Sequence, residues 1–403
     1  MLRMPNAHLL KFCSTILISL SLLLDLTIAK PNNLNSLPSL KSLSSQIQPT
    51  PPPPPTTTTS STTNQNLIMF CGGFFNLFQD NDYDLDTSNL LNSAIVFIKP
   101  HANTKAVQTL VTQKLTDAAP SMTILSEQTI SGSTIDKDKL IDQHYYAIAS
   151  KATILSAKEI SPSVPSGKFQ DFFGQAWDQV LKDGKAANAM EACRIFDCTE
   201  MELSTLWREA EADSKVVKFG GGFYCGKLQK GDTQLYVFNA FFMNMRAGFV
   251  DPDCSIYCYE VQWDPQELSW SDFRGKVLGP TDPSQAPKGS IRRTILNDYQ
   301  RLGLDAEPNK GLNGVHASAS PFEGLSEKTN WLGKKIKDDP FGAALLKAGL
   351  KKKVILDWCK DPRLKLEADS KVKLGSVGSV FDELEDNDVA ECFQKLTELK
   401  ELN

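Results

Sequence analysis

The sequence predicts a mixed α/β fold, of the α+β type, for the globular part of the chain. Residues 93–99 (SAIVFIK) are a run of β-formers that stops at Pro100, which is typical of a buried strand. Residues 255–263 (SIYCYEVQW) alternate in the manner of another strand. Between them, residues 104–118 place apolar side chains at helical spacing behind Thr104, which is suited to cap a helix.

Composition places the chain among soluble globular proteins. Its 403 residues suffice for two domains, or for one domain with a large insertion and tails. Hydrophobic residues make up 41% and charged residues 23%, as expected for a chain that buries a core. A net charge of -5 argues against a protein that coats nucleic acid, but it leaves room for a small basic pocket.

Cysteine and histidine usage argues against a protein-bound metal centre. Nine cysteines are scattered without a CxxC pair, and the chain has only four histidines. This pattern fits a reducing compartment at least as well as a disulfide scaffold.

The first 29 residues have the pattern of a signal peptide. Arg3 and Lys11 precede an apolar run over 12–24, and small residues near Ala29 offer a cleavage site. The run is short for a membrane span, so we expect no stable span; a retained signal anchor is the alternative.

Residues 30–68 are rich in Pro, Thr, Ser and Asn and contain no Asp or Glu, which predicts a disordered linker. A signal peptide followed by such a stretch is similar to a plastid import signal, and a secreted mucin-like stalk has the same composition. The expected route is therefore secretory, to a plastid or to the exterior, with a cytosolic form if Met69 serves as an internal start.

Two more elements are expected in the globular part: a strand over 122–130 and a short helix over 136–146. Residues 150–234 differ in sequence pattern from the strand-rich segments on either side. Helical patterns over 168–185 and 186–210 predict a mainly helical insertion within one domain.

Two further segments have simple structural interpretations. Gly220, Gly221 and Gly222 invite a phosphate-loop interpretation, but no GK[ST] or GxGxxG spacing is present. A turn or strand-edge bulge is favoured there. Residues 381–403 begin with DELED and predict an acidic C-terminal tail, most simply a solvated helix.

Five motifs in the same chain order resemble the nucleoside diphosphate kinase family. They are IKP at 98–100, HY at 144–145, VLGPTDP at 277–283, KGSIR at 288–292, and NGVHAS at 313–318 followed by Glu327. The resemblance implies a kinase-like domain over 90–380, interrupted by the insertion 150–234. It also implies a ferredoxin-like split βαβ sandwich, with an antiparallel sheet of about four strands covered on one face by helices.

The resemblance implies the catalytic residues. His316 corresponds to the phosphorylated histidine, Glu327 to the glutamate that orients it, and Ser318 to the serine of the same signature. A histidine suits this chemistry because an imidazole with an unperturbed pKa of ~6.5 is uncharged yet nucleophilic near neutral pH. His101 and His144 are left as structural residues.

The resemblance also implies the nucleotide-binding residues. Lys99 and Arg292 would supply positive charge to the phosphates, and Thr281 would add a hydroxyl donor. Asn313 would bind the ribose and phosphate end of the nucleotide, and Tyr145 would lie near the histidine. The expected metal is Mg²⁺ carried by the phosphates of ATP rather than by a protein cage.

The sequence departs from the family pattern at several points. The position after Ser318, often Asp in the family, is Ala319, and the segment before Asn313 is lengthened by residues 302–310. Strict register puts Gly275 where the family has a second phosphate-binding arginine, so Arg274 takes that role by a shift of one residue. Phe241, in NAFFMNM, is the candidate for the phenylalanine that stacks on the base.

The implied reaction converts ATP and a nucleoside diphosphate into ADP and a nucleoside triphosphate, by a ping-pong route through phosphohistidine, with loose base selectivity. Family members are often hexamers, so a homo-oligomer is one expectation; the alternative is that the insertion 150–234 blocks or replaces that assembly. Two alternatives stay open: a catalytically impaired module that binds nucleotides or partners, and a secreted structural protein built on the Pro/Thr-rich linker.

Overall fold

A computed structural model describes residues 89–366 and 377–403. The expected signal peptide (1–29) and linker (30–68) lie outside the described residues. In the part of the chain that is described, no helix has both the length and the apolar character needed to cross a membrane.

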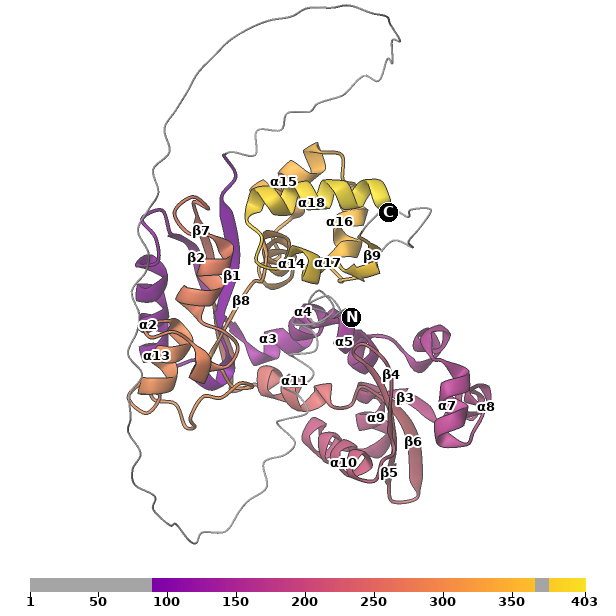
Figure 1. The fold of residues 1–403 in the computed structure, drawn as a ribbon. Helices are drawn as coiled ribbons and strands as arrows, with labels where there is room; N and C mark the ends of the chain where they lie inside the picture. Colours follow the sequence, from indigo (N-terminus) through magenta and orange to yellow (C-terminus); the bar gives the residue numbers. More distant parts are fainter. Residues whose placement is uncertain (1–88, 367–376) are drawn as a thin grey trace, which may run out of the picture. The chain divides into compact units, whose positions relative to one another are not determined.

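The main sheet has four strands in the order β2-β7-β1-β8, and every neighbouring pair is antiparallel (Figure 1). The strands are β1 (Asn92–Ile98), β2 (Thr123–Ser131), β7 (Ser255–Trp263) and β8 (Val315–Ala317). The mixed α/β architecture and the three strands expected from the sequence are confirmed.

Helices cover both faces of β1, whereas the sequence predicted helices on one face. Ala94, Val96 and Ile98 face a core shared with α2 (Lys105–Thr116) and α13 (Ile291–Asp298). Ile95 and Phe97 face a second core, which includes Trp331 of α14 (Pro321–Trp331). The reason is local: AIVFI is apolar at every position, so both sides of the strand require cover.

The remaining helical segments around this sheet are short. They are η3 (Pro100–Ala102), α3 (Gly132–Lys137), α4 (Leu140–His144), α5 (Tyr146–Ala149), α11 (Phe242–Val250), α12 (Trp270–Asp272), η6 (Phe273–Leu278), η7 (Pro283–Gln285) and η8 (Ile336–Asp338). The single helix expected over 136–146 is wrong, because the chain breaks between α3 and α4 at Lys139, whose φ is 57°. The N-cap expected at Thr104 is confirmed, since its side chain accepts a hydrogen bond from the Val107 N–H.

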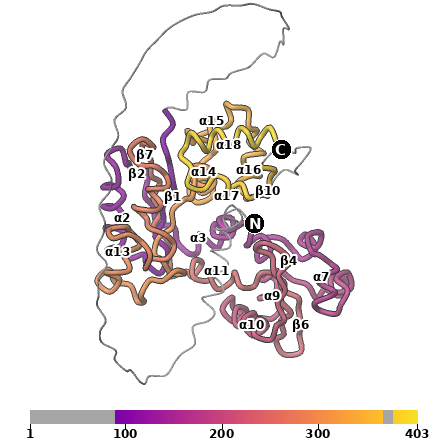
Figure 2. Tube along the Cα trace, viewed as in Figure 1, coloured from indigo at the N-terminus to yellow at the C-terminus, as the bar shows by residue number. Residues whose placement is uncertain are grey.

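The segment expected as a mainly helical insertion also contains a second four-stranded sheet, which the sequence did not predict. Its order is β3-β6-β5-β4, with β3 and β6 parallel and the other pairs antiparallel. Figure 2 shows the trace of this segment, with β4 and β6 labelled. The strands are β3 (Ala186–Asn188), β4 (Val216–Gly220), β5 (Phe223–Lys230) and β6 (Thr233–Phe238). The helical segments are η4 (Ser150–Ile154), α6 (Ala157–Ile160), η5 (Ser161–Ser163), α7 (Ser166–Phe173), α8 (Trp177–Lys182), α9 (Ala189–Phe196) and α10 (Glu200–Ala212).

The glycine-rich stretch is a hairpin. It links β4 to β5 through a turn at residues 221–222, with a register shift between Lys218 and Gly220. The prediction of a turn with a strand-edge bulge is therefore confirmed.

The expected acidic tail is a folded part of the protein, so its description as a solvated helix is wrong. Residues 340–403 contribute α15 (Pro340–Lys347), α16 (Lys352–Trp358), β9 (Arg363–Lys365), β10 (Val377–Ser379), α17 (Val380–Leu384) and α18 (Val389–Leu402). Beneath the acidic residues, α18 carries an apolar face, and Cys392, Leu396 and Leu399 on it are buried against Phe322 and Leu325 of α14. Apolar residues at helical spacing outweigh the acidic composition.

Candidate active site

His316 lies at the centre of the short edge strand β8, opposite Phe97 of β1. Its ring stacks on Phe97 with centroids 4.6 Å apart. Gly314 starts this strand with a φ of 84°, and a Cβ there would approach the Ile295 side chain to 3.1 Å. Glycine thus lets the chain turn tightly over α13 into the strand that carries the histidine.

Glu327 fixes one nitrogen of His316. Helix α14 begins at Ser320, which caps it, and Gly324 lets it pack against β1, because a Cβ there would meet the Ser93 carbonyl oxygen at 2.6 Å. This close approach puts Glu327 Oε1 2.6 Å from His316 Nε2. If Nε2 carries the proton and donates to Glu327, the lone pair of Nδ1 is free; within the described ranges, Nδ1 has no hydrogen-bond partner.

Ser318 completes a relay of three side chains. Its hydroxyl donates to Glu327 Oε2 at 2.6 Å and accepts the backbone N–H of Ile95 at 2.9 Å. Burial raises the pKa of Glu327, and the hydrogen bond from Ser318 lowers it in part. The serine therefore fixes the carboxylate in position and favours its ionised form.

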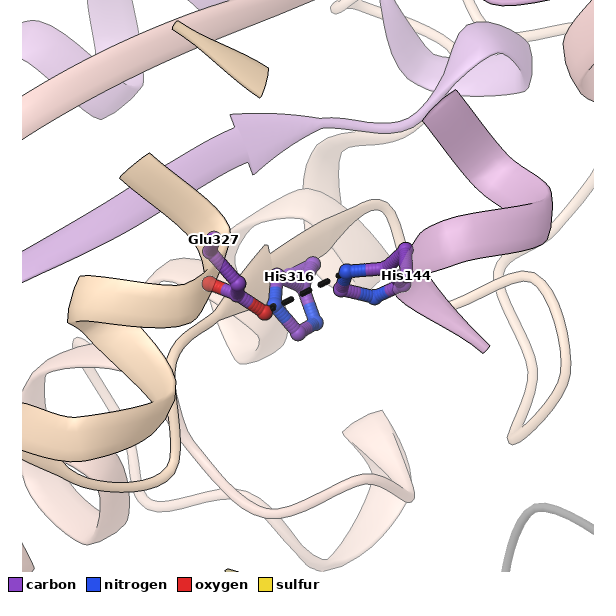
Figure 3. A group of neighbouring side chains, drawn as sticks. All are labelled: His144, His316 and Glu327. Atoms are coloured by element: carbon purple, nitrogen blue, oxygen red, sulfur yellow. Dashed lines mark hydrogen bonds and ion pairs between the residues drawn. The ribbon is translucent and has the colours of Figure 1, made fainter. Parts of the chain in front are cut away.

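His144, which the sequence left as structural, adjoins this relay. Its Nδ1 is 3.4 Å from the same Glu327 oxygen, so both imidazoles approach Oε1 (Figure 3). Trp331 Nε1–H donates to His144 Nδ1 at 3.3 Å, and burial lowers the pKa of His144 to about 3. The HY motif was the only sequence signal for this histidine, and it drew attention to Tyr145 instead.

His144, His316 and Glu327 are also a ligand set of the type that binds transition metals, with their ligand atoms within 4.8 Å of one another. Two features oppose a metal here. The Trp331 N–H already occupies His144 Nδ1, and positive side chains surround His316. Two nitrogen ligands also suit Mg²⁺ poorly, since it prefers oxygen.

Three predicted basic residues lie around His316. Burial, followed by the charges of Lys99 and Arg292, lowers the pKa of His316 well below its ordinary value, so the ring is neutral. Burial, and then the charge of Arg292, lowers the pKa of Lys99 to about 7. Arg274 contributes to the same positive field.

Arg292 is held by the backbone and is only 8% exposed. It donates from Nη1 to the Gly279 carbonyl at 2.8 Å, and from Nε and Nη2 to the Val315 carbonyl at 3.2 and 2.8 Å. One N–H on each terminal nitrogen is left over, which is the arrangement that can grip a phosphate with two parallel bonds.

Asn313 is 2% exposed and half satisfied. Its Nδ2 donates to the Thr281 carbonyl at 3.0 Å, but its Oδ1 is buried with no partner among the described residues. An unpaired buried acceptor costs roughly 1–3 kcal/mol, so native structures seldom keep one without a partner that binds there. Asn313 Oδ1 is therefore available to accept a hydrogen bond from a bound ligand.

One cavity of about 710 Å³ joins these residues. Of the predicted site residues, it is lined by Lys99, Tyr145, Arg274, Thr281, Arg292, Asn313 and His316. Ser318 and Glu327 lie behind His316 rather than on the cavity wall. The lengthened loop also reaches the wall, through Lys310 and Leu312.

Phe241 is not brought into the cavity, so its expected role beside the base is corrected. Its ring packs on Trp207 and Tyr224, at centroid distances of 5.9 and 5.4 Å. Phe242 lines the cavity instead. The chain turns from β6 into α11 at this point, and both rings pack on the same apolar cluster, but only Phe242 reaches the cavity wall, which the motif alone did not reveal.

Five acidic residues on the cavity wall were missed. They are Glu323, Asp361, Asp382, Glu385 and Asp386. Glu323 accepts the Ala319 N–H, and burial, together with the nearby Glu327, raises its pKa. The backbone of Ala319 is therefore bonded although its side chain has no polar group. The DELED pattern was the available signal, and it was assigned to solvent.

Comparisons with known proteins give little beyond this geometry. No protein-family model matches the sequence, and no curated protein is significantly similar to it. Among solved structures, the chain is similar to the crystal structure of an NDP kinase from Pyrobaculum aerophilum, with 14% identity and a TM-score of 0.29. The match covers 60% of this chain and 96% of that chain. At this TM-score, the likeness carries no argument about function.

Proposed function

We propose that the protein is a nucleoside diphosphate kinase, which transfers the γ-phosphate of ATP to nucleoside diphosphates through a phosphohistidine at His316. The observation that carries this proposal is the Ser318–Glu327–His316 relay, whose histidine faces a cavity lined by basic side chains. We also propose that the sheet order β2-β7-β1-β8 belongs to a ferredoxin-like split βαβ sandwich.

In the first half-reaction, the lone pair of His316 Nδ1 forms a bond to the γ-phosphorus of ATP. The bond from that phosphorus to the bridging oxygen breaks, and its electron pair leaves with ADP. The proton on Nε2 stays in its hydrogen bond with Glu327, which stabilises the positive charge that develops on the ring. A neutral histidine is required at the start, and burial with nearby cations maintains it.

In the second half-reaction, a terminal phosphate oxygen of a nucleoside diphosphate attacks the phosphohistidine. The P–N bond breaks, and its electron pair returns to Nδ1. Lys99 and the two spare N–H groups of Arg292 stabilise the charge on the transferred group in both halves. Mg²⁺ that arrives with the nucleotide neutralises part of the phosphate charge.

The nucleotide is held by groups that otherwise lack partners. Asn313 Oδ1 accepts a hydrogen bond from a ribose hydroxyl, which removes its unpaired state. Phe242, in place of Phe241, contributes apolar surface to the cavity.

The second candidate function is a module of the same fold that binds nucleotides without transferring phosphate. The observation that favours it is the acidic wall, because Arg274 Nη1 donates to Glu385 Oε1 at 2.9 Å instead of facing the cavity unopposed. In that case the site residues would be ligand contacts only.

One experiment separates the two functions. The full chain is incubated with γ-labelled ATP and Mg²⁺, then with a nucleoside diphosphate, beside His316→Ala. We expect acid-labile label on the wild type that passes to the diphosphate, and a loss of transfer of about 10⁴-fold or more in the variant. Wild-type protein that binds ATP but takes up no label would establish the binding module instead.

A further inference from the structure

Of the three basic residues around His316, Arg274 is paired with carboxylates, whereas the described residues place no carboxylate in an ion pair with Lys99 or Arg292. Its Nη1 donates to Glu385 Oε1 at 2.9 Å and to Asp386 Oδ1 at 2.5 Å. Both carboxylates line the same cavity as His316. By contrast, Arg292 donates only to backbone carbonyls, so its charge is not neutralised.

The turn that carries these carboxylates is fixed in place. The Asp386 N–H donates to the Ala319 carbonyl at 2.9 Å, which attaches the turn to the loop after His316. Two residues further on, Asp388 Oδ1 accepts from Asn92 Nδ2 and from the Trp270 N–H, each at 2.7 Å. The turn therefore holds both carboxylates beside Arg274.

The pairing leaves part of Arg274 unused. Only Nη1 contacts the turn, and Nε and Nη2 have no acceptor within residues 89–366 and 377–403. The guanidinium can thus still donate to a phosphate while its charge is largely offset. Arg274 is also close enough to add to the positive field at His316 and Arg292.

We propose that Glu385 and Asp386 are specificity-determining residues, which compete with nucleotide phosphate for Arg274 and lower affinity more for a triphosphate than for a diphosphate. This inference rests on the nucleotide-binding function proposed above. The charge of Arg274 is already offset, so each added phosphate charge gains little attraction from it. The two fixed carboxylates nearby also repel that charge. The turn therefore limits the advantage that ATP gains from its extra charge, and it keeps diphosphates competitive for one shared site.

The test is the double variant Glu385→Gln with Asp386→Asn, made in the full chain. Both changes keep side-chain size, and asparagine tolerates the positive φ of 62° at residue 386. Binding of ADP and of a non-transferable ATP analogue is measured with Mg²⁺ at fixed ionic strength. We expect ADP to bind a few-fold tighter, and the analogue about tenfold tighter, than to the wild type.

A matched control removes one charge from the same segment but away from Arg274. Glu383→Gln serves, because Glu383 Oε1 pairs with Lys395 Nζ at 3.1 Å. We expect this variant to bind both nucleotides like the wild type.

A double-mutant cycle shows whether the effect passes through Arg274. In an Arg274→Ala background, the Glu385→Gln and Asp386→Asn changes should lose most of their effect on affinity. Unchanged or weaker binding by the double variant, or the same gain without Arg274, would overturn the inference. Label transfer to His316 is measured separately from nucleotide affinity. If the protein binds ADP but takes up no label, the kinase mechanism fails, and the affinities still test the role of Glu385 and Asp386.

Discussion

The two four-stranded sheets differ most clearly in how each treats one buried asparagine. In the second sheet, Asn239 is fully buried and fully bonded: Nδ2 donates to the Ile148 and Gly222 carbonyls, and Oδ1 accepts the Tyr224 N–H. In the main sheet, Asn313 is almost as buried, but its Oδ1 has no partner in the described parts of the chain. Asn239 therefore stabilises the fold, whereas Asn313 keeps a buried acceptor, Oδ1, that a ligand can use.

The same contrast extends to charge. The second sheet surrounds itself with apolar clusters in which rings pack on rings, such as Phe169 with Tyr236. Its segment also buries Glu200, whose pKa is raised by burial, but that carboxylate pairs with Arg246. Near the main sheet, burial shifts the pKa of Lys99, His316 and Glu327, which lie close together. Groups held in such unfavourable states indicate a place where chemistry or binding occurs.

The largest expected effect is a loss of phosphoryl-transfer rate in Glu327→Ala. Glu211→Ala is its matched control, because both glutamates accept an N–H from an aromatic ring. Glu327→Ala removes the acceptor for His316 Nε2, and we expect the rate of phosphoryl transfer to fall about 10³-fold or more. Glu211→Ala removes the acceptor for Trp207 Nε1 on α10, beside the second sheet, and should leave the transfer rate unchanged. Single-turnover labelling of His316 measures both. Equal losses in the two variants would show that the relay acts through stability alone.

A smaller effect separates the two asparagines. We expect Asn313→Ala to weaken ADP binding about tenfold, because one hydrogen bond to the nucleotide is lost, with less than about 1 kcal/mol of unfolding free energy. Asn239→Ala strands two carbonyls and an N–H, so it should cost roughly 2–4 kcal/mol of unfolding free energy. Calorimetric titration and denaturant unfolding give the two readouts. If Asn313→Ala lost stability but kept its affinity for ADP, the contrast would be refuted.

The smallest expected effect is a pH dependence of kcat/KM that arises from Lys99, at the end of β1 in the main sheet. The pKa of Lys99 is lowered to about 7, so its charge is present below that pH and is lost as pH rises through it. We therefore expect kcat/KM for the nucleotide to fall several-fold between about pH 7 and pH 9. Lys99→Arg should remove this basic limb, since arginine stays charged. Lys218→Arg, on β4 of the second sheet, should leave the limb in place.

The sequence predicted best where the determinants are local. The strand around 93–99 and the histidine loop were found because their residues are adjacent in the chain. His316 and Glu327, which the motif places eleven residues apart, lie with Nε2 and Oε1 2.6 Å from each other. In the second sheet, β3 left no periodicity to detect, because it is three residues long and pairs in parallel with β6, far along the chain. Shortness does not explain the rest, because β5 and β6 have eight and six residues and pair as a hairpin.

Contacts between distant segments account for the other misses. His144 joins Glu327 only when α4 packs near α14, and no spacing in the sequence encodes that approach. The pairing of Arg274 with Glu385 joins positions more than a hundred residues apart. DELED predicted a solvated tail, but the segment folds because the apolar face of α18, which follows it in the chain, is buried.

The pairing of β1 with β7 has a consequence for how the chain acquires its fold during synthesis. Asn92–Ile98 lie against Ser255–Trp263, so the apolar first strand has no partner in the main sheet until residue 263 has left the ribosome. At ~5–20 residues per second, this delay is on the order of ten seconds. The intervening segment has its own apolar core and hairpins, which form from contacts closer in sequence. The main sheet is therefore completed late, around a segment that has already folded, and a nascent chain stalled before residue 255 would expose β1 to aggregation.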